Sequence, residues 1–249
     1  MTITKKRLCA YGLLLVLAIL LIGCEPSTSL SGDDTEHDTM NTINPTSFLL
    51  SITEIQSTTT YTITSSIFEE NYVRISYPYI EMLNVKMQEK INSLIWQEIY
   101  GLFSWHSEWE EPVTLDIDYE IKFSSDRLLS MIFSGIGHVP GAPRPFWIFH
   151  TLNINVVNGE KIMLSDVINI DAYLIELLLS ESIVYLNPDP SIKEAVREII
   201  SANDFLYHWI YSTDQIIFYF THDSLGISIT LPHVLGGYAI LEINYDKLK

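Results

Sequence analysis

The chain has 249 residues, of which 31 are Asp or Glu and 14 are Lys or Arg, so its formal net charge is −17. A surface with this excess of negative charge repels nucleic acids and attracts cationic partners, which excludes nucleic-acid binding. The apolar fraction of 47% is enough for the core of one domain or of two small domains.

The first predicted element is a bacterial lipoprotein signal peptide over residues 1–23. Basic residues at 5–7 precede an apolar run at 8–22, which is followed by Gly23 and Cys24. The run is long enough for a signal but short for a helix that must cross about 30 Å of hydrocarbon. We expect cleavage before Cys24, attachment of diacylglycerol and palmitate to this cysteine, and a mature protein on the extracytoplasmic face of the cell membrane. An uncleaved anchor and an ordinary signal are the alternatives.

Removal of the signal leaves 11 of the 14 basic residues against 31 acidic ones, a formal charge of −20. Cys9 leaves with the signal and Cys24 carries lipid, so no cysteine remains for a disulfide, a thiol nucleophile or a thiolate metal site. The sequence also lacks a His-Glu-x-x-His motif, a nucleophile elbow and a phosphate-binding glycine loop. We therefore predict no metal and no cofactor.

The next segment, residues 24–58, is rich in Ser, Thr and Asp, which predicts a flexible tether between lipid and folded region. An N-terminal strand–helix subdomain is predicted over 59–112. Alternating β-branched and aromatic residues predict strands at 61–64 and 72–77.

A long amphipathic helix is predicted over 82–102, where apolar residues recur at spacings of three and four. Gly101 is expected to end it. Its exposed face is predicted to carry the charged residues Glu81, Lys86, Glu89, Lys90 and Glu98.

A C-terminal α+β domain is predicted over 113–249. Its strands are predicted at 113–123, 128–134, 147–157, 160–164, 204–211, 215–221, 226–231 and 239–244. Asn158-Gly159 predicts a hairpin turn, and helices are predicted over 171–186 and 192–202. Because strands and helices come in blocks, we expect an α+β fold with mainly antiparallel sheets, one long helix near the N-terminus of the folded region and two or three shorter helices.

Three groups of segments carry a family likeness. The first is 75–80 (ISYPYI) with 88–92 (QEKIN). The second runs from 129–133 (LSMIF) through Gly141-Ala142 to 152–155 (LNIN) and 158–166 (NGEKIMLSD), and the third is 218–221 (FYFT) with 231–239 (LPHVLGGYA). Here the chain resembles the paired extracytoplasmic domains of lysozyme-sensing anti-sigma factors and of peptidoglycan-deacetylase accessory regions in Gram-positive bacteria. We expect neither a deacetylase domain nor a cytoplasmic sigma-binding segment in this chain. The resemblance therefore implies a stand-alone lipoprotein version of these domains.

The connection 135–145 is the main candidate binding loop, because it is rich in glycine and proline and contains His138 and Arg144. Relatives in the resembled family commonly carry a histidine after Gly-Ala, whereas here Pro143 and Arg144 follow Gly141-Ala142. The alternative is a proline-stiffened crossover that packs over the core.

A second candidate cluster follows the long helix and comprises Trp105, Trp109 and Glu110. Exposed tryptophans beside carboxylates suit a sugar face or a cationic protein, whereas buried tryptophans would anchor the helix end. Asp116 and Asp118 lie two apart on a predicted strand and therefore point to one face. They form either an acid–base pair or part of a wet face, and His222-Asp223 is either a dyad or a turn.

These features favour a non-catalytic binding or sensor module for a cationic partner in the cell envelope, with a lysozyme-type muramidase as the partner that the resemblance implies. The alternative is a peptidoglycan-active enzyme or an accessory domain of cell-wall modification, which would bind peptidoglycan fragments and use Asp116, Asp118 or His138 as acid or base. A scaffold lipoprotein is a third possibility that the sequence does not distinguish from the first.

Overall fold

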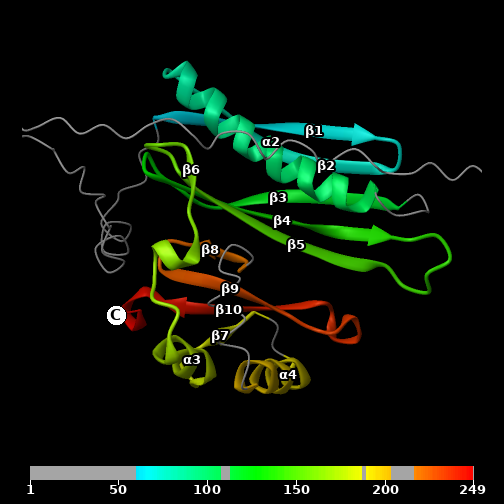
Figure 1. Ribbon diagram of the computed structural model, residues 1–249, viewed down its shortest axis with the longest axis vertical. Coiled ribbons are helices and arrows are strands. Elements are labelled where there is room, and N and C mark those ends of the chain that lie inside the picture. The colour runs from blue at the N-terminus through cyan, green and yellow to red at the C-terminus, as the bar shows by residue number, and fades with distance from the viewer. Residues whose placement is uncertain (1–59, 108–112, 187–188, 203–215, 249) are drawn as a thin grey trace, which may run out of the picture. The chain divides into compact units, whose positions relative to one another are not determined.

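The computed structural model describes residues 60–107, 113–186, 189–202 and 216–248 (Figure 1). These residues form two β-sheets, paired mostly antiparallel, together with long and short helices, which confirms the α+β class. The expected signal peptide, Cys24 and the expected tether lie outside the described residues. Within the described part of the chain, no helix is both long and apolar enough to cross a bilayer.

The larger sheet has six strands in the order β1-β2-β3-β4-β5-β6. Its strands are β1 (Tyr61–Glu70), β2 (Val73–Met82), β3 (Thr114–Ser124), β4 (Leu128–His138), β5 (Phe146–Asn155) and β6 (Glu160–Lys161). All neighbours pair antiparallel except β2 and β3, which are parallel because a helix connects them. The predicted boundary between 59–112 and 113–249 falls between these two paired strands. The Asn158-Gly159 turn joins β5 to β6, as predicted.

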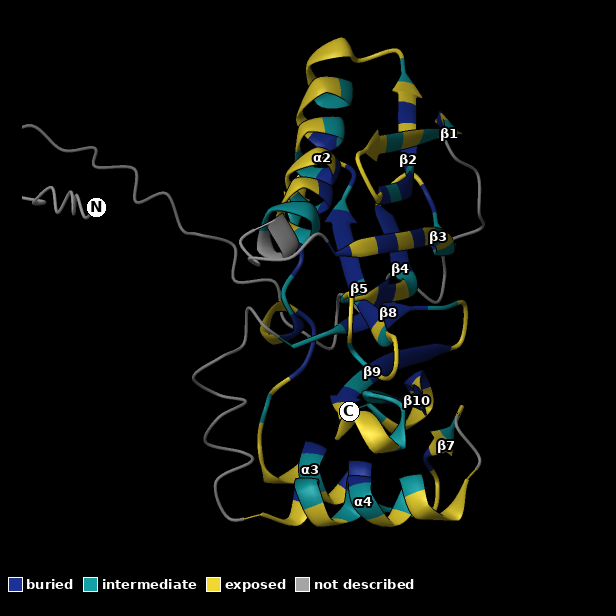
Figure 2. Cartoon of the chain, turned by 90° about the vertical axis from the view of Figure 1, so that its right-hand side faces the viewer, coloured by how far each residue is buried: buried dark blue, intermediate teal, exposed yellow. Residues whose placement is uncertain are grey.

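Helix α2 (Val85–Ser107) lies along one face of this sheet (Figures 1 and 2). Its buried residues Ile91, Ile95 and Ile99 recur every four positions and pack on apolar residues of the sheet. The Asn84 side chain accepts a hydrogen bond from the main-chain N–H of Met87 at 3.2 Å and caps the first turn. The prediction that the helix ends near Gly101 is wrong. Packing continues beyond this residue through Phe103, and the helix continues with it.

The smaller sheet has four strands in the order β7-β10-β9-β8, all antiparallel. They are β7 (Val184–Tyr185), β8 (Phe218–Phe220), β9 (Ser224–Thr230) and β10 (Tyr238–Asn244). Two short helices, α3 (Ala172–Leu179) and α4 (Pro190–Ser201), pack their buried residues into the same core as this sheet. Single-turn helices lie at Leu164–Asp166, His233–Leu235 and Tyr245–Lys247.

The helix predicted over 171–186 is shorter than expected. Asp171 caps its start by accepting a hydrogen bond from the N–H of Leu174 at 3.1 Å. The helix ends at Leu179, before a polar segment, and the β-branched Val184 with Tyr185 pairs with β10 instead.

Polar side chains of β4 and β5 meet the free edge of β8. The Oγ1 of Thr151 accepts from the N–H of Phe218 at 3.1 Å, and the Oγ of Ser130 accepts from the N–H of Phe220 at 2.9 Å. The Ser130 hydroxyl donates in turn to Oδ1 of Asn153 at 2.7 Å. These buried groups satisfy the edge that an additional strand would otherwise occupy.

Candidate functional site

The predicted binding loop is the tip of the hairpin between β4 and β5. His138 ends β4, and Arg144 lies in the connection to β5; both are exposed. Gly141 has φ of 80° in a turn closed by the N–H of Ala142 and the carbonyl oxygen of Val139 at 3.0 Å. The loop therefore projects from the sheet and does not form a crossover over the core. Neither the His138 nor the Arg144 side chain forms a hydrogen bond or an ion pair with another described residue.

Next to this loop, one row of side chains runs across four strands on the face of the sheet opposite α2. Register places Arg74 of β2 beside Asp116 of β3, Asp116 beside Ile136 of β4, and Ile136 beside Trp147 of β5. We call these four residues, with Asp118 and Glu69, the Trp147 face. Trp147 is 54% exposed and Ile136 is 43% exposed, although both are large and apolar.

Three carboxylates of the Trp147 face share the guanidinium of Arg74. Its Nη1 lies 3.1 Å from Oδ1 of Asp116 and 3.5 Å from Oδ1 of Asp118, and its Nε lies 3.9 Å from Oε1 of Glu69. The hydrogen bond to Asp116 is the main reason why the pKa of Arg74 is raised. Because one cation serves three anions, the face keeps a surplus of negative charge beside its two exposed apolar side chains.

The β9–β10 connection borders this face. A Cβ atom added to Gly237 would lie 4.0 Å from the Cβ of Trp147, so the two chain segments are neighbours. The same connection carries Val234, which is largely exposed. Next to Trp147 along β5 on the same face, Phe149 stacks on Tyr238 with ring centroids 4.7 Å apart. This stacking fixes the strand that carries Trp147 against the smaller sheet.

A different polar cluster lies between α2 and the β5–β6 edge. Oε2 of Glu98 lies 2.8 Å from Nε2 of His150, and Oε1 of Glu98 accepts from Nζ of Lys161 at 2.7 Å. Burial of Glu98 would raise its pKa, but the hydrogen bonds to His150 and Lys161 outweigh this and lower it to about 2. Both oxygens are therefore occupied, and the cluster joins the helix to the sheet.

The prediction that Glu98 lies on the exposed face of the helix is wrong, because its side chain is only 17% exposed. Glu98 follows Ile95 by three residues and precedes Ile99 by one, so the helical period puts it on the flank of the buried stripe. The sequence contained no sign that β6 and His150 would cover that side of the helix.

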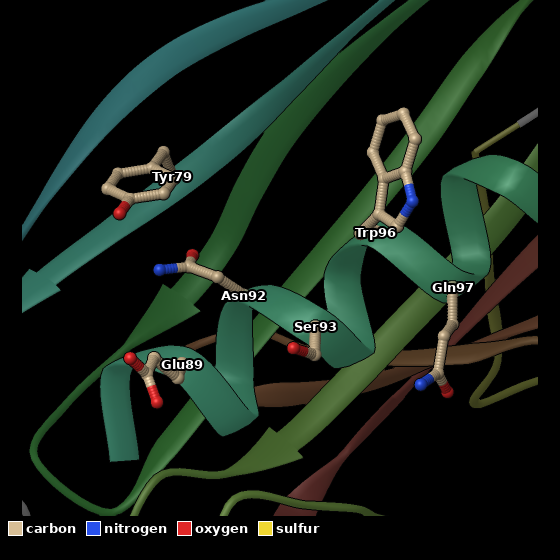
Figure 3. Close-up of a pocket in the computed structure, with 6 residues that line it drawn as sticks. All are labelled: Tyr79, Glu89, Asn92, Ser93, Trp96 and Gln97. Carbon is tan, nitrogen blue, oxygen red and sulfur yellow. The ribbon is translucent and has the colours of Figure 1, made fainter. Parts of the chain in front are cut away.

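An open groove of about 470 Å³ lies on the other flank of α2, towards β2 (Figure 3). Tyr79 projects from β2, and the remaining lining residues come from one stripe of α2. They are Glu89, Asn92, Ser93, Trp96 and Gln97. Sequence reasoning missed this site, although the spacing of 89, 92, 93, 96 and 97 is the signature of one helix face.

The other predicted site residues are not brought together by the described structure. Trp105 belongs to the last turn of α2, whereas Trp109 and Glu110 lie outside the described residues. His222 sits in the β8–β9 turn and contacts the ring of Phe123 edge-on at 5.1 Å, while Asp223 accepts from the Thr221 hydroxyl, which confirms the turn interpretation of His222-Asp223. No set of three or more potential metal ligands occurs in the described ranges.

No protein-family model matches the chain, and no curated protein matches it. The chain is similar in structure to a DUF3298-family protein from Bacteroides fragilis, with a TM-score of 0.49 and 13% identity over 77% of this chain and 93% of that one. It is also similar to a DUF3298-family protein from Pseudomonas aeruginosa, with a TM-score of 0.40 and 9% identity over 78% of this chain and 94% of that one. These structural neighbours are bacterial domains of unknown function.

Proposed function

We propose that this protein is a non-catalytic extracytoplasmic binding module whose Trp147 face captures a cationic protein of the cell envelope. The observation that carries the proposal is the row of exposed Trp147 and Ile136 beside carboxylates that share one guanidinium. An exposed indole offers stacking area and a cation–π surface for arginine or lysine, and the adjacent carboxylates pair with the same groups.

Two arrangements favour binding over catalysis. Arg74 bridges Asp116 and Asp118, so these residues form an ion-pair cluster on a wet face and not a pair of carboxyls that exchange protons. The Glu98 carboxylate has both oxygens engaged by His150 and Lys161. Neither cluster offers a free base beside a free acid.

The partner that we propose is a lysozyme-type muramidase, a strongly basic protein. A charge of −20 on the chain after Cys24 would steer a basic protein toward this surface and increase the rate of association. The hairpin that carries Ile136 and Trp147 also carries His138 and Arg144 at its tip, which places the predicted loop at the rim of the same face.

We further propose that Cys24 carries the lipid that holds the protein on the extracytoplasmic face of the membrane. Replacement of the thiol by a hydroxyl in Cys24→Ser should move the protein from the membrane fraction to the soluble fraction. Retention on the membrane would mean that the run 8–22 is an uncleaved anchor.

The Trp147 face is tested by kinetics of binding to immobilised hen egg-white lysozyme. Trp147→Ala should weaken binding about tenfold or more, mainly through faster dissociation. Asp116→Asn with Asp118→Asn should slow association instead. Trp96→Ala, which removes an exposed tryptophan on the α2 side of the sheet, is the matched control. Equal binding by wild type, both face variants and the control would remove the face from the proposal.

A further inference from the structure

The groove between α2 and β2 is long enough to hold an extended ligand that lies along the helix. Its helical residues run from Glu89 to Gln97, a stripe about 12 Å long at a rise of about 1.5 Å per residue. Tyr79 of β2 forms the opposite wall. The site is open along its length, so it suits a chain of small rings that lies on the surface.

Two aromatic rings line the groove and remain available. Trp96 is 40% exposed and Tyr79 is 37% exposed. Phe68 holds the indole edge-on at 5.6 Å between ring centroids, and Tyr77 contacts it at 6.0 Å. Trp96 is therefore fixed before a ligand arrives, which lowers the entropy cost of stacking on it.

The polar groups of the groove divide into fixed and free ones. Asn92 is fixed, because its side chain accepts from the N–H of Ile80 at 2.9 Å and donates to the carbonyl oxygen of Ile80 at 2.8 Å. The side chains of Glu89, Ser93 and Gln97 are exposed and form no hydrogen bond or ion pair with another described residue. A carboxylate, a hydroxyl and an amide are thus left to face a ligand along one stripe.

We propose that this groove binds a short pyranose oligosaccharide. A sugar ring presents a C–H face that stacks on Trp96 or Tyr79 and a rim of hydroxyls that the free polar side chains can bond. A purely apolar ligand would leave the groove's polar groups without partners, and a strongly charged one would meet only one carboxylate. The proposal is independent of the cationic partner, because the groove lies on the α2 side of the sheet and the Trp147 face on the other side.

The test is a titration of the full-length protein, in micelles of a phosphocholine detergent without a sugar headgroup, followed through the indole N–H signals by NMR. The two probes are triacetylchitotriose and cellotriose, which share the ring but differ in the acetamido group. The Trp96 signal, assigned with Trp96→Phe, should shift with at least one probe at millimolar concentration. A shift with triacetylchitotriose alone would identify an acetamido-sugar site, and shifts with both would identify recognition of the ring.

Variants distinguish sugar binding in the groove from a nonspecific effect of sugar on the protein. Tyr79→Ala removes the other aromatic ring of the groove and keeps the Trp96 signal as the readout, so it should weaken the binding about tenfold. Ser93→Arg removes no packing and places a long side chain in the groove, so it should abolish binding in a protein that still folds. Trp147→Ala is the matched control and should bind sugar as wild type does. No shift of the Trp96 signal with either probe, or binding that survives Ser93→Arg, would overturn the proposal.

Discussion

The side-chain amide of Asn153 on β5 donates a hydrogen bond to the main-chain carbonyl oxygen of Phe218 on β8 at 2.7 Å, and both residues are buried. β8 is the edge of the smaller sheet, and its outer backbone groups face the larger sheet. The Asn153 amide therefore supplies a hydrogen bond that a neighbouring strand would otherwise supply. Asn153 also accepts from the hydroxyl of Ser130. One side chain therefore links two strands of the larger sheet to the edge of the smaller one.

Asn153→Leu preserves the size of the side chain and removes its polar atoms. We expect the free energy of unfolding to fall by about 1–3 kcal/mol, since the carbonyl oxygen of Phe218 loses its partner in a buried place. Urea denaturation followed by circular dichroism measures this change. Ser93→Ala, at an exposed helix position, should stay within about 0.5 kcal/mol of wild type. Equal stability of the two variants would show that the amide contributes nothing to holding β8.

The strands and the long helix were predictable because their signals are local. Alternating β-branched and aromatic residues indicated β1 and β2, and Asn158-Gly159 marked the turn into β6. The inward orientation of Ser130, Thr151 and Asn153 was not predictable in the same way. Polar residues at alternate positions look like a wet face, and only the arrival of β8 over these side chains makes them buried.

For the binding surfaces too, local features were predictable from the sequence and contacts between distant segments were not. The exposed position of the predicted loop with His138 and Arg144 followed from its glycines and prolines. The Trp147 face depends on the register of four strands, and two of these, β2 and β3, pair across the long helix that separates them in the sequence. Spacing within one segment contains no information on that pairing, so Trp147 and Arg74 were not recognised as neighbours.

Acid titration of stability should report on Glu98. Its pKa of about 2 in the folded state lies below the ordinary value of 4.5, so its ion pairs stabilise the fold fully above about pH 4.5. This contribution is lost as the pH falls towards 2. Between pH 5 and pH 2, the free energy of unfolding should therefore fall more steeply for wild type than for Glu98→Gln.

Glu194→Gln is the matched control for this titration, because Glu194 is an exposed helix residue without an ion pair to any described residue. Its acid profile should follow that of wild type. Parallel profiles for wild type and Glu98→Gln would mean that the contacts to His150 and Lys161 do not lower the pKa of Glu98.

Two glycine substitutions should have opposite effects on stability. Gly226 pairs with Tyr219 across β9 and β8, and a Cβ atom at Gly226 would overlap the Tyr219 ring. Gly226→Ala should therefore destabilise the fold by about 1–3 kcal/mol and disturb the bond from the Tyr219 hydroxyl to Glu242. Gly101→Ala should stabilise it by about 0.5–1 kcal/mol, because Gly101 lies inside α2 with nothing within 4 Å of a new Cβ.

Thermal unfolding of the two glycine variants beside wild type measures both effects. A loss of stability in Gly101→Ala would indicate that the helix ends near this residue after all. Tolerance of Gly226→Ala would mean that the Tyr219 ring does not lie over this position.

The most direct test of the proposed function is a calorimetric titration of the full-length protein with hen egg-white lysozyme at low and at physiological salt. We expect saturable binding that weakens as salt screens the acidic surface, that is about tenfold or more weaker with Trp147→Ala, and that is unchanged with Trp96→Ala. Absence of binding at low salt, or binding of equal strength in wild type and Trp147→Ala, would contradict the proposal.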